Sequence, residues 1–256
     1  MANERTSAGD PRRTLDLLWR RPGARTAQRG PRPSLTVDAV VAAAISLADD
    51  EGLEAVTMRR VAHSLGVAPM SLYTYVPGKP ELLDLMLDTV YAEMPRTDLS
   101  GRGWRERVAA VARDNRALYD RHPWVAAVST ARPPLGPGLM AKYEHELSAF
   151  ADLHLDDVEM DAALTFLVSF VLACARAARE VAAARRESGM NDEQWWAANA
   201  ALLAHVVDPA AYPTAARVGA AAGAAHGAAY SPEHAYEFGL QRVLDGLGAL
   251  IDARGG

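Results

Sequence analysis

The sequence of 256 residues has a single cysteine, Cys174, so no disulfide can form within the chain. The lack of a disulfide framework fits a reducing compartment, and we expect a cytoplasmic protein. The sequence also lacks an uninterrupted apolar run of the roughly 18 residues that cross a membrane. Thr165 and Ser169 interrupt its most apolar segment, residues 162–175. No signal-peptide pattern follows the basic N-terminus, and we expect no membrane partner.

Alternating apolar and polar residues, the pattern of a half-buried strand, are missing from the sequence, as are internal repeats. Apolar residues recur instead at helical spacing, as in residues 37–48, and we predict an all-α protein. The sequence also lacks the patterns that mark metal, phosphate and acyl-transfer sites, such as His-Glu-x-x-His, glycine-rich phosphate loops and Gly-x-Ser-x-Gly. These absences argue against an enzyme, and we expect no metal and no cofactor.

The protein lacks an excess of positive charge, because its net charge is −5. The basic residues are unevenly distributed along the chain. Residues 1–34 hold eight arginines and three acids, whereas residues 35–94 hold three basic and nine acidic residues. No acid lies between Glu54 and Glu81, although this stretch contains Arg59, Arg60 and Lys79. Binding to phosphates depends on the face that a protein presents, so the net charge does not exclude a DNA-binding protein.

Residues 57–79 predict two short helices joined by a glycine turn. Thr57 is placed to cap the first helix, and Gly66 is placed to end it in the left-handed conformation. Ala62 is small enough to let a second helix cross closely, and Pro69 suits the first position of that second helix. This is the layout of a helix-turn-helix, whose second helix enters the major groove of DNA.

This stretch and the helix before it resemble the TetR family of one-component regulators. The resemblance covers about 60 residues and is carried by Leu35, Thr36, Ala43, Ala44, Leu47, Glu51, Gly52, Thr57, Arg59, Val61, Ala62, Gly66, Val67, Ser71, Leu72, Tyr73, Tyr75, Val76, Lys79 and Leu82. It implies a three-helix DNA-binding domain, a helical domain with a small-molecule effector pocket, and a homodimer. Two residues depart from the family pattern. Family members often have Ser or Thr at the position of Ala68, and a smaller residue is more usual at the position of Met70.

We expect three regions: a basic, flexible N-terminal arm (residues 1–34), a DNA-binding domain with its connecting helix (35–94), and an effector-binding and dimerisation domain (95–256). Residues 29–33, Arg-Gly-Pro-Arg-Pro, resemble an AT-hook core that enters the minor groove. A solvated tail without specific contacts is the alternative. The residues predicted to contact DNA are Thr57, Arg59, Pro69, Met70, Ser71, Tyr73, Thr74, Tyr75 and Lys79, together with Arg25, Arg29 and Arg32 of the arm. Lys79, at the start of a helix predicted for residues 80–94, would hold a phosphate.

The region after residue 95 reads as a series of helices, with a loose Ala/Gly tract over residues 215–229. Helices predicted at 156–187 and 231–253 are the candidates for the dimer interface. The second presents Phe238, Val243 and Leu247, for which packing inside one subunit is the alternative. The residues predicted to line an effector pocket are Asn115, Trp124, Met140, Tyr143, Phe166, Phe170 and Trp195. For each of them, a place in the core is the alternative.

Together these features predict a ligand-responsive transcriptional regulator, a homodimeric repressor that leaves a palindromic operator in double-stranded DNA when a small, largely apolar effector binds. One rival is an enzyme with a metal near His145 or His154, but solvated helix faces explain these histidines better. The other rival is an architectural DNA-binding protein that ignores ligands and uses mainly the arm. It predicts weak sequence preference, whereas the regulator predicts a palindromic footprint.

Overall fold

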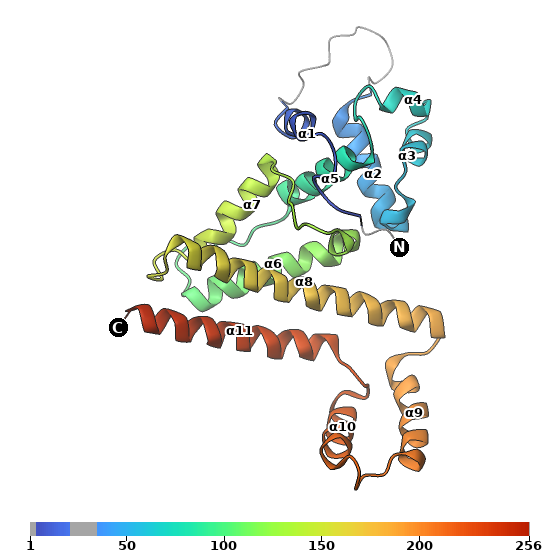
Figure 1. The fold of residues 1–256 in the computed structure, drawn as a ribbon, viewed down its shortest axis with the longest axis vertical. Coiled ribbons are helices and arrows are strands. Elements are labelled where there is room, and N and C mark those ends of the chain that lie inside the picture. Colours follow the sequence, from blue (N-terminus) through green and yellow to red (C-terminus); the bar gives the residue numbers. More distant parts are fainter. Residues whose placement is uncertain (1–3, 21–34, 256) are drawn as a thin grey trace.

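A computed structural model describes residues 4–20 and 35–255, and within these ranges the regular secondary structure is helical apart from one isolated bridge between Arg5 and Ser129. The prediction of an all-α fold is confirmed. Figure 1 shows a small helical unit that holds α2 to α4, a larger unit below it, and a helical hairpin that projects from the larger unit. The connecting helix α5 (Lys79–Glu93) lies between the two units.

The smaller unit, which is predicted to bind DNA and is called the DNA-binding unit below, consists of α2 (Val37–Glu51), the 3₁₀ turn η1 (Leu53–Ala55), α3 (Met58–Ser64) and α4 (Pro69–Leu72). The cap predicted at Thr57 is confirmed, because Thr57 Oγ1 accepts a bond from Arg60 N at 3.2 Å, and Thr36 Oγ1 caps α2 in the same way by accepting a bond from Ala39 N at 3.0 Å. Gly66 has a φ of +66°, which gives the chain its reversal between α3 and α4. The unit therefore takes its shape from local signals.

The larger unit is built from α6 (Trp104–Arg121), the 3₁₀ helix η2 (Pro123–Ala127), α7 (Pro137–Ser148), α8 (Asp157–Ser188) and α11 (Pro232–Gly255). The long helices α8 and α11 lie side by side and run in opposite directions (Figure 1). They match the two helices predicted for dimerisation to within two residues. Val243 and Leu247 of α11 are buried inside the subunit, whereas Phe238 is exposed. Of these three residues, Phe238 alone is available to a partner.

The hairpin consists of α9 (Asp192–Val206) and α10 (Pro213–His226). The expectation of a loose segment over residues 215–229 is wrong for most of that range. Alanine has the highest helix propensity, and the many alanines of α10 outweigh its glycines. Gly223 serves close packing, because a Cβ atom at this position would lie 2.3 Å from the Trp196 ring.

The arm predicted for residues 1–34 has a helical part. Helix α1 (Pro11–Leu18) is capped by Asp10, whose carboxylate accepts a bond from Arg13 N at 3.0 Å. Leu18 is buried, and the helix packs against α5. Residues 4–20 are therefore docked on the body. Residues 21–34, with the predicted DNA contacts Arg25, Arg29 and Arg32, lie outside the described residues.

Candidate DNA-binding and effector-binding sites

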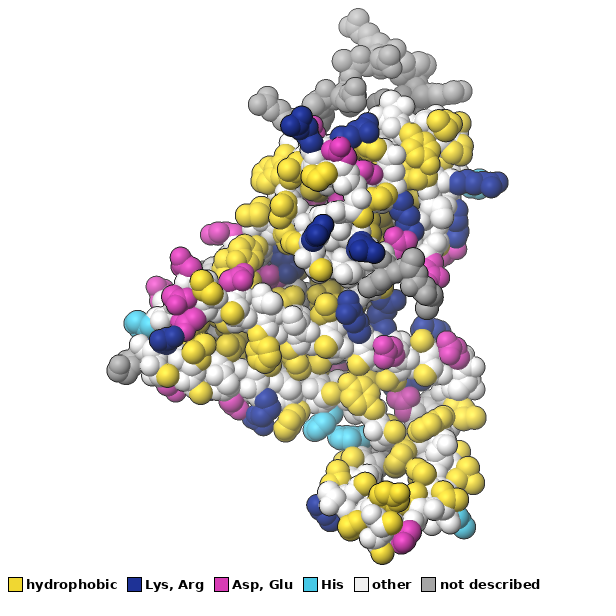
Figure 2. All heavy atoms as spheres, in the orientation of Figure 1, with side chains coloured by type: hydrophobic (Ala, Val, Ile, Leu, Met, Phe, Trp, Pro, Cys, Tyr) yellow, Lys and Arg dark blue, Asp and Glu magenta, His cyan; other side chains and the backbone are white. Residues whose placement is uncertain are grey.

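The recognition helix α4 is a single turn whose inner face is anchored and whose outer face is free. Leu72 is 0% exposed, while Met70 is 76% and Tyr73 45% exposed. Pro69, Ser71 and Thr74 are exposed as well. The structure thus brings these five predicted DNA contacts together on one outward face, and Figure 2 shows hydrophobic side chains gathered over α4 at the tip of the unit. Ala68 precedes α4 but provides no side-chain cap, because a methyl group cannot accept a hydrogen bond.

The first helix of the motif, α3, carries polar residues with different roles. The Thr57 hydroxyl is engaged as the cap of α3, and Arg59 is exposed. Arg60 donates to Glu51 at 2.5 Å, and this hydrogen bond holds the pKa of the Glu51 carboxyl below its usual value. Tyr75 is half-buried behind α4. Arg59 is therefore the arginine of α3 that is available to a phosphate.

Lys79 begins α5, where Gly78 provides no side-chain cap. The amides of such a helix start attract anions, as expected for the predicted phosphate contact. In the structure the Lys79 ammonium already has a partner, because its Nζ lies 2.6 Å from Glu4 Oε1. Sequence reasoning missed Glu4, which lies 75 residues away along the chain and belongs to no motif.

Helix α5 connects the two units through buried acids. Both carboxylate oxygens of Asp88 accept bonds from the start of α7, from Gly138 N at 3.1 Å and Leu139 N at 2.9 Å. Asp84 accepts a bond from Ser7 N at 2.9 Å. Burial raises the pKa of Asp84 to about 6, with a smaller contribution from Glu81, and burial also raises the pKa of Asp88.

A second connection joins α2 to the larger unit. Asp49 Oδ1 accepts a bond from Trp124 Nε1 at 2.8 Å and lies 2.8 Å from His122 Nδ1. Trp124, predicted as a pocket residue, is 1% exposed. The structure therefore places Trp124 in the core, with its indole bonded to the DNA-binding unit.

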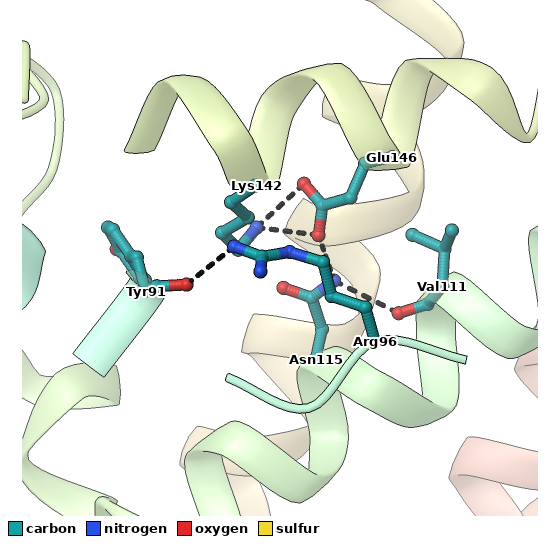
Figure 3. Close-up of polar contacts among 6 residues, drawn as sticks. All are labelled: Tyr91, Arg96, Val111, Asn115, Lys142 and Glu146. Atoms are coloured by element: carbon teal, nitrogen blue, oxygen red, sulfur yellow. Dashed lines mark hydrogen bonds and ion pairs between the residues drawn. The ribbon is translucent and has the colours of Figure 1, made fainter. Parts of the chain in front are cut away.

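A buried polar cluster lies between α5, α6 and α7 (Figure 3). Asn115, predicted as a pocket residue, is fully buried and donates to Glu146 Oε1 at 2.5 Å. Lys142 Nζ donates to both oxygens of Glu146 at 2.7 Å and lies 5.5 Å from the centre of the Tyr91 ring. Arg96 donates to the Tyr91 carbonyl at 2.9 Å. The Asn115 Oδ1 and Arg96 Nε atoms are buried without a hydrogen-bond partner among the described residues, so the cluster has unused capacity for polar groups.

The other predicted pocket residues lie apart from one another. Met140 and Phe166 are exposed, the Tyr143 hydroxyl donates to Asp161 at 2.8 Å, and Phe170 stacks on Tyr236 with 6.0 Å between ring centres. Trp195 lines a half-open groove of about 250 Å³ at the base of the hairpin, together with Tyr230, Met190 and Val181. The structure does not gather the predicted set around one cavity. Lys142 and Glu146 escaped prediction because an i, i+4 pair of opposite charges usually lies on a solvated face.

Helix α8 is apolar but poorly covered by its own subunit. Among the described residues it is the one helix whose length and composition would allow it to cross a membrane, with a mean hydropathy of 1.8 over its most apolar window. Only 22% of that window is buried. Val158 and Phe166 of α8 and Phe238 of α11 are exposed. This pair of helices therefore presents apolar surface that a protein partner could cover.

Comparisons with known proteins cover both units. Residues 40–86 match the family model of bacterial regulatory proteins of the tetR family, and residues 97–251 match that of the tetracyclin repressor-like C-terminal domain. The chain is 43% identical, over 260 residues, to the HTH-type transcriptional repressor DrrR1 of Streptomyces coeruleorubidus, an alignment that covers 100% of this chain and 92% of that protein. An HTH-type transcriptional regulator of Saccharopolyspora erythraea is 36% identical over 146 residues, which are 57% of this chain and 59% of that protein.

Two solved structures of ActR from Streptomyces coelicolor are similar as well. The apo form has a TM-score of 0.69 and 27% identity, with 87% of this chain and 99% of ActR covered. The complex with actinorhodin has a TM-score of 0.71 and 27% identity, with 85% and 97% covered.

Proposed function

Because the chain belongs to the TetR family of bacterial regulatory proteins, we propose that it is a homodimeric repressor that leaves a palindromic operator when a small, largely apolar effector binds. A repressor is proposed because the 43%-identical relative carries that name. An effector is proposed because ActR has been solved with actinorhodin and with (S)-DNPA. The cytoplasm, where an operator is accessible, is the proposed place of action.

The exposed face of α4 is the observation that carries this proposal. Met70 and Tyr73 are large side chains that are exposed to solvent, and the buried Leu72 anchors the turn that presents them. A single-turn helix reaches few base pairs, so specific binding requires two copies placed about one helical turn of DNA apart. The exposed apolar residues of α8 and α11 support a dimer that provides this spacing.

The acids that join the two units support a coupling between effector and DNA. Asp88 bonds the start of α7 to the middle of α5, and Asp49 bonds η2 to α2. We propose that the effector binds in the larger unit near the buried polar cluster of Asn115, Lys142 and Glu146. Its binding shifts α7 and changes the tilt of α5, so that the two copies of α4 no longer span one turn of DNA. An effector achieves this only to the extent that it binds the two arrangements unequally.

The test is a footprint and a titration on the DNA upstream of the protein's own gene. We expect a palindromic footprint, and we expect Tyr73→Ala to weaken operator binding about tenfold because both half-sites lose a contact. Leu202→Ala is the matched control, since this exposed residue of α9 lies on the hairpin and should not change affinity. A monomer that ignores duplex DNA at low salt would contradict the proposal. Weak preference among sequences would favour an architectural protein instead.

A further inference from the structure

Residues 4–20, which we call the N-terminal strap, contact two parts of the molecule that the proposed mechanism moves relative to each other. On one side the strap contacts the 129–135 loop between η2 and α7, and on the other it contacts α5. Figure 1 shows this dark blue segment passing beside α5 before it forms α1. The strap therefore connects the larger unit to α5, the helix that carries Lys79.

The contacts with the loop fix the backbone at the start of the strap. Ser129 N donates to the Glu4 carbonyl at 2.9 Å, and Thr6 N donates back to the Ser129 carbonyl at 3.2 Å. The Thr6 hydroxyl also donates to the Arg132 carbonyl at 2.5 Å. Glu4 is thus held from its backbone by the larger unit, which leaves its side chain free to reach the DNA-binding unit.

The contacts with α5 place the strap at the start of that helix. Ser7 N donates to Asp84 Oδ1 at 2.9 Å, and Asp10 N donates to Glu81 Oε1 at 3.4 Å. Gly9 allows the approach, because a Cβ atom there would lie 2.3 Å from Glu81 Oε1. With its backbone held at these points, the strap brings Glu4 within 2.6 Å of Lys79 Nζ.

We propose that Glu4 is a built-in competitor for the operator phosphate at Lys79. A carboxylate and a phosphate oxygen require the same ammonium group, so Lys79 must leave Glu4 to contact DNA. The DNA-facing stretch has no acid between Glu54 and Glu81, and the carboxylate that reaches its lysine comes from the strap.

This inference rests on the proposed function and adds a regulatory contact to it. Because Ser129 holds the Glu4 backbone, a displacement of the 129–135 loop relative to α5 moves Glu4 relative to Lys79. An effector that stabilises the seated loop keeps Lys79 neutralised and lowers operator affinity. An arrangement in which the loop moves away frees Lys79 for phosphate. The strap therefore couples the larger unit to DNA affinity by a route separate from the tilt of α5.

The test measures binding of full-length protein to its footprinted operator by fluorescence anisotropy between 50 and 200 mM salt. We expect Glu4→Gln to bind about three to ten times more tightly, because the two Lys79 ammonium groups of a dimer no longer have to leave a partly exposed ion pair before they contact phosphate. Asp16→Asn is the matched control. It removes the same charge from an exposed position of the strap and should change affinity less than twofold.

The dependence on Lys79 is tested by combining variants. Lys79→Gln should weaken binding, and adding Glu4→Gln to it should give no further change, because the competed contact no longer exists. Equal affinities of Glu4→Gln and wild type would overturn the inference. The same gain in the Lys79→Gln background, or with Asp16→Asn, would also overturn it, since the effect would then be general charge repulsion.

The result separates the two proposals. If wild-type protein binds no duplex at all, the proposed function fails and takes the inference with it. If wild type binds the operator and Glu4→Gln binds it equally well, only the role of Glu4 fails. Circular dichroism of each variant checks that the fold is retained, as we expect for a substitution at a partly exposed side chain.

Discussion

The two units of this protein are stabilised in different ways. The DNA-binding unit relies on local devices: hydroxyl caps at Thr36 and Thr57, a left-handed glycine at Gly66, and a small apolar core. The larger unit relies on contacts between residues far apart in the sequence and includes a buried ion pair, Lys142–Glu146. It also leaves apolar surface on α8 and α11 uncovered. A unit that only presents a reading surface can be fixed locally, whereas a unit that is proposed to respond to a ligand and to pair with a second copy would depend on contacts that can rearrange.

The largest expected effect concerns the buried ion pair of the larger unit. Lys142→Met removes one partner and leaves the Glu146 carboxylate buried, with Asn115 as its remaining donor. We expect this variant to lose about 3–5 kcal/mol of unfolding free energy, as is usual when one member of a buried pair is removed. Urea denaturation measures this loss.

The double variant Lys142→Met/Glu146→Leu is the matched control. It should recover most of the loss, because no uncompensated charge remains. If the single and double variants were equally destabilised, packing rather than charge would explain the effect. The two units would then differ less in what stabilises them.

The next effect concerns the apolar core of the DNA-binding unit. Leu72 is 0% exposed and joins α4 to α3. We expect Leu72→Ala to lose about 3 kcal/mol of unfolding free energy, because the truncation leaves a cavity. Met70→Ala, on the exposed face of the same turn, should leave stability unchanged and weaken operator binding. Calorimetry combined with anisotropy separates the two outcomes, and a stable Leu72→Ala variant would show that α4 is not held by this contact.

The sequence predicted the DNA-binding unit better than the larger unit, and the reason is the range of the interactions. The caps, Gly66 and the start of α4 at Pro69 follow from neighbouring residues, and the structure has them where they were expected. The resemblance to the TetR family rests on the same residues and is confirmed by the family models. The contact residues themselves, from Thr57 to Lys79, remain predictions.

Long-range pairing is what sequence reasoning could not supply. Nothing in the sequence distinguishes Lys142–Glu146 from a solvated i, i+4 pair, and only the packing of α7 against α5 buries it. Trp124 is of a residue type that commonly lines pockets, but its indole donates a hydrogen bond to Asp49 of the DNA-binding unit. Glu4 pairs with Lys79 across 75 residues of sequence. The helices of the larger unit could be predicted, but the candidate pocket could not.

A smaller effect, on the dependence of stability on pH, tests the connection between the strap and α5. Burial raises the pKa of Asp84 from 3.8 to about 6 in the folded protein, so the folded state binds a proton more tightly than the unfolded state. This contribution to stability is complete below about pH 4 and is lost as the pH rises to about 6. We expect a loss of about 1–2 kcal/mol between pH 4.5 and 7.5, after allowing for solvent screening.

Asp84→Asn should remove this part of the pH dependence. The variant keeps a side-chain oxygen for the bond from Ser7 N, but it cannot ionise. Urea denaturation of both proteins at pH 4.5 and 7.5 gives the comparison, and only the difference between the two pH values is interpreted. Identical differences for wild type and variant would mean that Asp84 titrates normally and that the strap leaves it accessible to water.

The smallest effect concerns the caps of the DNA-binding unit. Thr57→Ala removes the acceptor for Arg60 N, and we expect a loss of about 1 kcal/mol in unfolding free energy. Ala68→Ser provides the reverse change, because α4 has no side-chain cap and a serine hydroxyl could accept a bond from a free amide of the first turn. We expect a gain of about 0.5 kcal/mol there, measured by the same denaturation experiment. If Thr57→Ala left the unfolding free energy unchanged while Leu72→Ala lowered it, the DNA-binding unit would be stabilised by its core alone. Local caps would then not distinguish it from the larger unit.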